Sequence, residues 1–306
     1  MSWSASIGKL LQMKIFLSVV SLLFVLMFMA FVFQQTQNSK GITAAQPRAS
    51  APSFTTVFQP SFTTINSIPL PKDYHRVEVA EKSFAAWLRK VNLRKNNTVY
   101  LYNKQPKANQ SLHYAVLDIS TGNKDLQQCA DALMRLKAEY HFSTSAYDQI
   151  NFIAGDKTVF NFKEFAKGKR YALRGQRLSS SQSAADNSCY THLCLMQFLD
   201  WVFSYCSTYT LQSQTKAITN LEEIMPGDML VKAGSPGHAM MVGDVAVNSV
   251  TGKKIFLLVQ GFMPAQDIHI VKNPNNLSLG PWFEVGGSNK IITPGWVFEK
   301  SQLRKW

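Results

Sequence analysis

The stretch Ile224–Gln260, IMPGDMLVKAGSPGHAMMVGDVAVNSVTGKKIFLLVQ, contains two apolar runs that each carry a polar residue at one end. His238 follows a tight turn of Gly, Ser and Pro and opens the run Ala239–Val242. A polar break leads into the run Ile255–Val259, which ends in Gln260. Short apolar runs bounded by turn residues indicate buried strands. We therefore expect Gln260 to end the strand beside that of His238 and to point towards the imidazole across the sheet.

A histidine held by a side-chain acceptor is the general base that cysteine-nucleophile hydrolases use. Cys129, in a predicted helix far upstream, can supply the cysteine. A free thiol has a pKa of about 8.5, and it becomes a nucleophile when an imidazole takes its proton near a helix N-terminus. We predict Cys129 as the nucleophile, His238 as the base and Gln260 as the residue that orients the ring. Asn248 and Asp244 are the alternatives to Gln260.

Four more residues are candidates for supporting roles in this site. Gln128 precedes the thiol and could stabilise an oxyanion. His113 opens a strand shortly before the cysteine helix and is the second candidate for the base. Asp228 closes a Pro-Gly turn before a strand, and His269 lies on a later strand. His269 and Asp267, two residues before it, could join the site or lie on a solvated face.

The same residues also have plain structural explanations. Cys129 shares the apolar face of its helix with Leu133 and Leu136, and free cysteine is among the most buried residue types. His238 follows Pro-Gly and could satisfy backbone groups in a turn. A lone glutamine such as Gln260 is commonly an edge-strand amide. Core packing of the thiol therefore stands beside catalysis as an explanation.

A zinc site is a further alternative, built from two histidines and two aspartates: His238, His269, Asp228 and Asp244. The chain has no His-x-x-x-His or Cys-x-x-Cys spacing that would support it. We therefore expect neither a metal nor another cofactor.

The composition is that of a basic globular chain. It has 306 residues, 46% of them hydrophobic, and a formal net charge of +13. This length is enough for one large domain with a real core. A basic balance favours an anionic neighbour, such as phospholipid or an acidic wall polymer. The basic residues are scattered and no nucleic-acid motif is present, so we expect no nucleic-acid partner.

The N-terminus predicts a membrane anchor. Ile15–Phe33 holds no charged residue and follows Lys9 and Lys14. Nineteen helical residues nearly span a bilayer core of about 30 Å, and the run exceeds the usual signal-peptide length of about 7–15 residues. We expect residues 1–37 to form a cytoplasmic tip and a single-pass signal anchor in a bacterial inner membrane, with the rest in the periplasm. Cleavage near Ala44, which would release an exported protein, is the alternative.

Beyond the anchor we expect a flexible linker at residues 38–68, rich in Thr, Ser, Gln and Pro, and a single α+β domain at residues 69–306. The expected helices cover residues 83–91, 125–140 and 190–209. The expected strands cover residues 99–102, 113–119, 229–231, 239–242, 255–259 and 268–271.

The chain has four cysteines: Cys129, Cys189, Cys194 and Cys206. In an exported protein they could pair, but one pair among the last three would still leave two thiols. The sequence leaves the pairing open.

Two resemblances add to these expectations. The order of a cysteine on a helix, Gly227-Asp228 before a strand, Gly237-His238 at a strand start and Gln260 on the next strand resembles the papain-like NlpC/P60 and CHAP wall hydrolases. The resemblance implies a papain-like α+β cysteine-hydrolase fold and cleavage of peptide or amide bonds in peptidoglycan. The chain departs from those families in the residues around Cys129 and in the long gap between Cys129 and His238.

The second resemblance rests on four motifs that occur in order, at residues 83–89, 125–140, 234–239 and 263–269. They are similar to a family of uncharacterised bacterial envelope proteins, known as domain of unknown function 4846. This implies an envelope setting and a shared fold.

We therefore expect a membrane-tethered envelope protein with a cysteine-nucleophile amidase or peptidase activity on cell-wall peptide or a related amide. Its partners would be the inner membrane, through the N-terminal helix, and peptidoglycan or another anionic envelope polymer. The alternative is a non-catalytic envelope binding or scaffold module with a papain-like fold.

Overall fold

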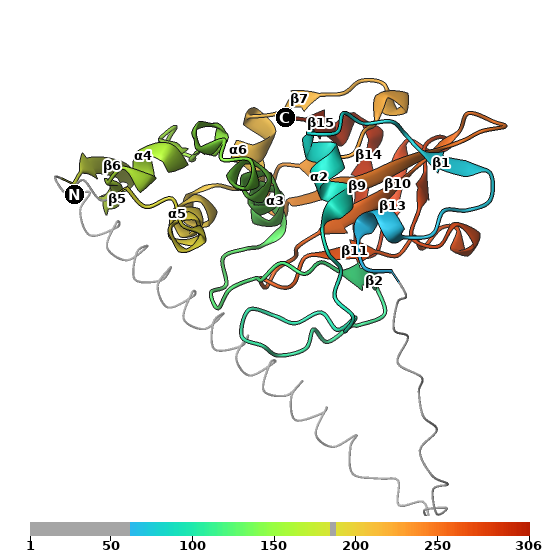
Figure 1. The fold of residues 1–306 in the computed structure, drawn as a ribbon, viewed down its shortest axis with the longest axis horizontal. Coiled ribbons are helices and arrows are strands. Elements are labelled where there is room, and N and C mark those ends of the chain that lie inside the picture. Colours follow the sequence, from blue (N-terminus) through green and yellow to red (C-terminus); the bar gives the residue numbers. More distant parts are fainter. Residues whose placement is uncertain (1–61, 184–187) are drawn as a thin grey trace, which may run out of the picture. The chain divides into compact units, whose positions relative to one another are not determined.

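The computed structural model describes residues 62–183 and 188–306 (Figure 1). The predicted anchor, Ile15–Phe33, lies outside these residues. Within the described ranges, no helix combines the length and the apolar character needed to cross a membrane. The anchor and its orientation therefore stay predictions.

One antiparallel sheet organises the described chain. Its strands are β1 (Tyr74–Arg76), β2 (His113–Val116), β7 (Lys216–Ala217), β8 (Met229–Lys232), β9 (His238–Asn248), β10 (Lys254–Gln260), β11 (His269–Val271), β12 (Phe283–Glu284) and β15 (Leu303–Lys305). The strand order is β2-β11-β10-β9-β8-β15-β7, with β1 paired to β9 and β12 paired to β10. The strands β9 and β10, predicted from sequence, lie near the middle of this order.

Three two-stranded sheets and five α-helices complete the described fold. The small sheets pair β3 (Asn151–Ile153) with β4 (Val159–Asn161), β5 (Lys169–Arg174) with β6 (Arg177–Gln182), and β13 (Lys290–Thr293) with β14 (Trp296–Glu299). The helices are α2 (Phe84–Lys90), α3 (Cys129–Ser143), α4 (Phe162–Ala166), α5 (His192–Tyr205) and α6 (Thr208–Ser213). The fold thus mixes helices with sheets, is mostly sheet, and confirms the expected mixture at that level.

The strands β9 and β10 are buried along most of their length because both of their faces are covered. Met241 packs into the cluster that also contains Leu133 of α3, whereas the neighbouring Met240 packs into a second cluster with Phe298 of β14. Successive side chains of a strand point to opposite faces, so two covered faces require a continuous apolar run. Both α2 and α3 contact β9, as Figure 1 shows.

Several expected boundaries differ from those in the structure. Residues 99–102 do not form a strand but two isolated bridges, Tyr100 to Pro106 and Leu101 to Gln266. The helix expected at 125–140 begins only at Cys129. The helix expected at 190–209 is divided, because Cys206 has extended dihedral angles between α5 and α6.

The hydrophobic core also starts earlier than expected. Phe62, Ile65 and Ile68 are buried in the core, although the domain was expected to begin at Pro69. Phe62 stacks on Tyr114, with 5.3 Å between the ring centroids. In the sequence these apolar residues alternate with Thr, Asn and Ser, so no apolar run marks them as core residues.

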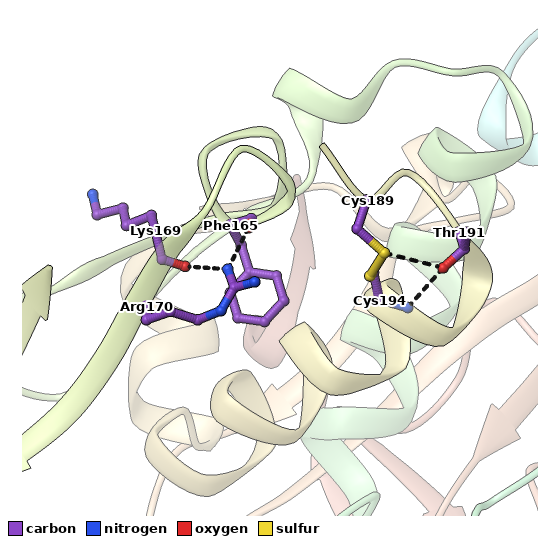
Figure 2. The surroundings of a disulfide bond; sticks show 6 residues. All are labelled: Phe165, Lys169, Arg170, Cys189, Thr191 and Cys194. Atoms are coloured by element: carbon purple, nitrogen blue, oxygen red, sulfur yellow. Dashed lines mark hydrogen bonds between the residues drawn. A yellow bond between two sulfur atoms is a disulfide. The ribbon is translucent and has the colours of Figure 1, made fainter. Parts of the chain in front are cut away.

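A disulfide joins Cys189 and Cys194, whose Cα atoms lie 6.1 Å apart (Figure 2). Between them Thr191 caps α5, and its hydroxyl accepts the N–H of Cys194 at 3.2 Å. Cys129 and Cys206 remain free thiols. The pairing that the sequence left open is thus local, and it anchors the start of α5.

Candidate active site

A cavity of about 640 Å³ contains both residues predicted to do the chemistry, Cys129 and His238. Its walls come from the start of α3, the α5–α6 junction, the turn before β9, the loop after β10 and one residue of β14. The lining residues are Asp125, Leu126, Gln128, Cys129, Ala130, Asp131, Phe203, Cys206, Ser207, Thr208, Gly234, Ser235, Pro236, Gly237, His238, Phe262, Met263 and Trp296. Segments far apart in the sequence therefore meet around two free thiols, Cys129 and Cys206, and one imidazole.

The thiol of Cys129 lies at the positive end of a helix. Gln128 is the N-cap of α3 and Cys129 is its first helical residue. Burial raises the pKa of the half-buried Cys129 thiol, and the Asp131 carboxyl raises it further. Hydrogen bonds from backbone N–H groups, including those of Ala130 and Ala239, act in the opposite direction. The effects that raise the pKa are larger than those that lower it, so Cys129 rests as a protonated thiol with backbone N–H donors around it.

The start of α3 lies against the sheet, because α3 contacts β9 and the backbone N–H of Ala239, the residue after His238, acts on the pKa of the Cys129 thiol. Gly261, just after β10, makes a second close approach. A Cβ at Gly261 would lie 2.7 Å from the carbonyl oxygen of Gln128 and 2.9 Å from the Cβ of Ala132. Contacts below 3 Å would force the backbone to move, so the absence of a side chain there lets the end of β10 abut the start of α3.

His238 is 2% exposed and is held by an amide. Its Nε2 lies 2.8 Å from Oε1 of Gln260, the contact expected from the strand pattern. Nε2 of Gln260 lies 3.1 Å from Nε2 of His269, and Nδ1 of His269 lies 2.8 Å from the carbonyl oxygen of Asp267. Neither Asn248 nor Asp244 makes this contact with the ring.

This chain of bonds determines where the proton of each ring lies. A carbonyl oxygen only accepts, so Nδ1 of His269 donates to Asp267 and Nε2 of His269 accepts from the amide of Gln260. The amide oxygen of Gln260 then accepts from Nε2–H of His238. The remaining nitrogen of His238, Nδ1, is left without a proton and is free to act as a base.

Aromatic rings surround His238. The rings of Phe262, Trp296 and Phe298 have their centroids 5.0, 5.1 and 5.8 Å from that of the imidazole. Burial lowers the pKa of His238 to about 4, although the hydrogen bond that Nε2–H donates to Gln260 acts in the opposite direction. The imidazole is therefore neutral at neutral pH, which is the protonation state that a general base needs.

The strand that carries His269 is fixed by Asp267. One carboxylate oxygen accepts from Nη1 of Arg94 at 2.7 Å and from the backbone N–H of Tyr100 at 2.9 Å. The other accepts from the hydroxyl of Thr121 at 3.2 Å. Asp267 was considered for the site from sequence, and it supports the site through the backbone rather than by lining the cavity.

The structure does not bring every predicted residue to the cavity. Gln128 lines it, and its side-chain amide donates to Asp125 at 3.2 Å. His113, the second candidate for the base, is buried behind His269 and bonds through Nε2 to the carbonyl oxygen of Asn97 at 2.5 Å. Asp228 accepts the N–H of Met225 at 2.8 Å and closes the turn before β8. Neither His113 nor Asp228 lines the cavity.

Asp131 is a cavity residue with a capping role. The i, i+4 spacing of Asp131, Arg135 and Glu139 in the sequence suits ion pairing along one face of the helix. The structure pairs only Arg135 with Glu139, at 2.7 Å, whereas Asp131 accepts the backbone N–H of Gln128 at 3.1 Å. An acidic residue at the third position of a helix commonly caps the helix in this way, and that signal was present.

A comparison with known families covers the part of the chain that forms this site. A family described as a domain of unknown function (4846) matches residues 65–305. The chain belongs to this family. The 4846 domain therefore includes the main sheet, α3 and the whole lining of the cavity. No curated protein and no solved structure matches the chain.

Proposed function

We propose that this 4846 domain is a cysteine-nucleophile hydrolase that cleaves an amide or ester bond. One observation carries the proposal: a single cavity presents a thiol at the first residue of a helix and a buried imidazole whose Nδ1 is unprotonated. Cys129, His238 and Gln260 take the roles of nucleophile, base and orienting residue. This is the arrangement that thiol hydrolases use.

In the proposed reaction, Nδ1 of His238 takes the thiol proton as the sulfur of Cys129 attacks the carbonyl carbon. Backbone N–H groups at the start of α3 and the side-chain amide of Gln128 stabilise the oxyanion. The imidazolium then gives its proton to the leaving amine, which departs and leaves a thioester. A water molecule, deprotonated by His238, attacks the thioester and releases the carboxylic acid and the thiol.

The same geometry supports a papain-like comparison and, through it, a cell-wall peptide as the substrate. The NlpC/P60 and CHAP hydrolases share an order in which a cysteine on a helix is followed by a histidine at a strand start and a polar residue on the next strand, and Gln260 takes the last place here. Residues 144–190 lie between Cys129 and His238, and those of them that the structure describes, 144–183 and 188–190, contribute nothing to the cavity lining. They account for the long gap between the two residues without disturbing the site.

The proposed setting is the periplasmic face of a bacterial inner membrane, with the domain tethered by the N-terminal anchor. The disulfide between Cys189 and Cys194 supports an exported location, because disulfides persist in oxidising compartments. Peptidoglycan or another anionic envelope polymer is the proposed partner.

The decisive test is Cys129→Ala in the full-length chain, with purified peptidoglycan and its stem peptides as substrates. We expect hydrolysis to fall by at least about a thousandfold, as it does when a catalytic nucleophile is removed. Cys206→Ser is the matched control, because Cys206 is the other free thiol of the cavity. Activity that survives Cys129→Ala would exclude the thiol mechanism.

A non-catalytic envelope binding module is the second candidate. The observation in its favour is that burial raises the pKa of both free thiols, that of Cys206 to about 12, so neither rests as a thiolate. A binding module would keep its affinity for the wall polymer after Cys129→Ala and His238→Ala. Pull-down on purified wall sacculi, measured alongside hydrolysis, separates the two candidates.

A further inference from the structure

The cavity and the whole chain differ in the sign of their charge. The chain has 32 Lys and Arg against 19 Asp and Glu. Among the described residues that line the cavity, the charged side chains are Asp125 and Asp131, with no lysine or arginine. A random sample of this surface would have the opposite balance. The cavity is therefore an acidic recess in a basic molecule.

Asp131 is an unusual wall residue because it is only 7% exposed. One of its oxygens accepts the N–H of Gln128 at 3.1 Å, and no donor within the described ranges reaches the other, Oδ1. Burial raises the pKa of Asp131 well above its usual range. A buried carboxyl with a free oxygen and no cation beside it lacks the partner that would stabilise its charge.

Asp125 adds an exposed carboxylate to the lining of the same cavity. Both of its hydrogen bonds go to Oδ1, from the backbone N–H of Ala265 at 2.7 Å and from the amide of Gln128 at 3.2 Å. Oδ2 accepts no bond from the part of the chain that the structure describes. Asp125 and Asp131 thus border the thiol with acceptor capacity that the chain itself leaves unused.

We propose that the cavity selects a substrate that carries a primary ammonium group near the reacting carbonyl, held against Asp125 and Asp131, and that it disfavours carboxylate-bearing groups. This inference rests on the proposed function, because it names the substrate class of the same site. The apolar walls formed by Phe203, Phe262 and Trp296 would accommodate the uncharged part of such a compound.

A bound cation would also change the thiol. The Asp131 carboxyl raises the pKa of Cys129, so an ammonium group that offsets its charge lowers that pKa and favours the thiolate. The substrate would thus supply the positive charge that the cavity lining lacks. An anionic ligand would act in the opposite direction.

Charge-selective thiol reagents test the inference without any hydrolysis. The full-length chain with Cys206→Ser is labelled with methanethiosulfonates that carry an aminoethyl cation, a sulfonatoethyl anion or a neutral methyl group. Mass spectrometry gives the rate at Cys129, normalised to the rate of each reagent with a free small thiol. We expect the cation to react about tenfold faster than the anion, as a nearby unit charge in a partly screened site requires.

Two variants assign this preference to the two carboxyls. In Asp131→Asn, which keeps an acceptor for the N–H of Gln128, and in Asp125→Asn, the preference for the cation should fall several-fold. Asp118→Asn removes an exposed carboxylate outside the cavity and should leave it unchanged. Equal rates for cation and anion, or a preference that both cavity variants retain, would overturn the proposal. So would a Cys129 that reacts with none of the three reagents.

A competition experiment extends the test from reagents to substrate-like groups. Alaninamide, a cation at neutral pH, should protect Cys129 from the neutral reagent at lower concentration than N-acetylalaninamide does. Equal protection would contradict selection of an ammonium group. The result is independent of the hydrolase proposal, which fails instead if hydrolysis survives Cys129→Ala.

Discussion

Two buried polar clusters lie on the same strand, β9, and they differ in charge. At its start, His238 belongs to a neutral chain of bonds through Gln260 to His269. Further along, Asp244 is fully buried between two guanidinium groups, with Nε of Arg76 at 2.6 Å and Nε of Arg89 at 2.7 Å. Only the first cluster reaches the large cavity.

The difference shows what each cluster can do. In the Asp244 cluster both carboxylate oxygens already accept from a guanidinium group, so the cluster joins β1 and α2 to the sheet and offers no free carboxylate oxygen to a ligand. The His238 cluster is neutral and ends in an unprotonated nitrogen, so it can accept a proton. Burial alone therefore does not distinguish a site from a structural core; the unused acceptor does.

The largest expected effect is on the His238 cluster. His238→Ala should lower hydrolysis, and the alkylation of Cys129 by iodoacetamide, by about 10²–10⁴-fold, because the thiol loses its base. The thermal unfolding midpoint should change far less than the rate. Alkylation at the wild-type rate in this variant would contradict a functional role for the His238 cluster, because it would show that Cys129 reacts without His238.

The opposite pattern is expected for the Asp244 cluster. Asp244→Ala removes the carboxylate that two partly buried guanidinium groups share and leaves them only backbone carbonyl partners, which costs about 3–5 kcal/mol of unfolding free energy. Urea denaturation measures this loss. In the fraction that stays folded, Cys129 should be alkylated at the wild-type rate. A stable Asp244→Ala variant with an unreactive thiol would reverse the roles of the two clusters.

The pH dependence of stability sharpens the same contrast. Burial lowers the pKa of His238 to about 4 and that of His269 to about 3. The unfolded chain, with a histidine pKa of about 6.5, then binds more protons, so stability is full above pH 6.5 and is lost as the pH falls towards 4. At about 1.4 kcal/mol per pKa unit, one such histidine accounts for about 3 kcal/mol between pH 6.5 and pH 4.

His269→Gln isolates this contribution, since glutamine can keep one donor and one acceptor. Urea titrations at several pH values should show a shallower acid loss in the variant than in the wild type. Raised carboxyl pKa values at Asp131 and Asp228 act with the opposite sign in both proteins, so the difference between the two curves is the quantity to compare. Identical slopes would mean that His269 is not held neutral by burial.

The smallest effect is expected at Gln260. Gln260→Ala removes the acceptor that orients His238, and a small misplacement of a reacting group costs up to about a hundredfold in rate. Gln260→Glu keeps an acceptor but adds a negative charge, which should raise the pKa of His238. Its pH–alkylation profile should therefore move to higher pH. An unshifted profile would show that the side chain at position 260 does not contact the working base.

The sequence predicted the strand half of the site better than the helix half. His238 and Gln260 lie at the ends of uninterrupted apolar runs, and strand alternation and turn residues are local signals. The helix was predicted to begin at Asp125 because residues 125–128 fit the helical period. In the structure Gln128 is the N-cap, and α3 begins at Cys129. Trp296 reaches the cavity from the β13–β14 hairpin, and no local pattern reveals such a long-range approach.

The close approach at Gly261 has a consequence for how the site is built. The thiol belongs to one end of α3 and the imidazole to one end of β9, and no covalent link fixes their separation. The end of β10 touches the backbone of Gln128 at a position with room for a hydrogen atom but not for a methyl group. A side chain at Gly261 would therefore push the start of α3, which carries Cys129, away from the sheet that carries His238.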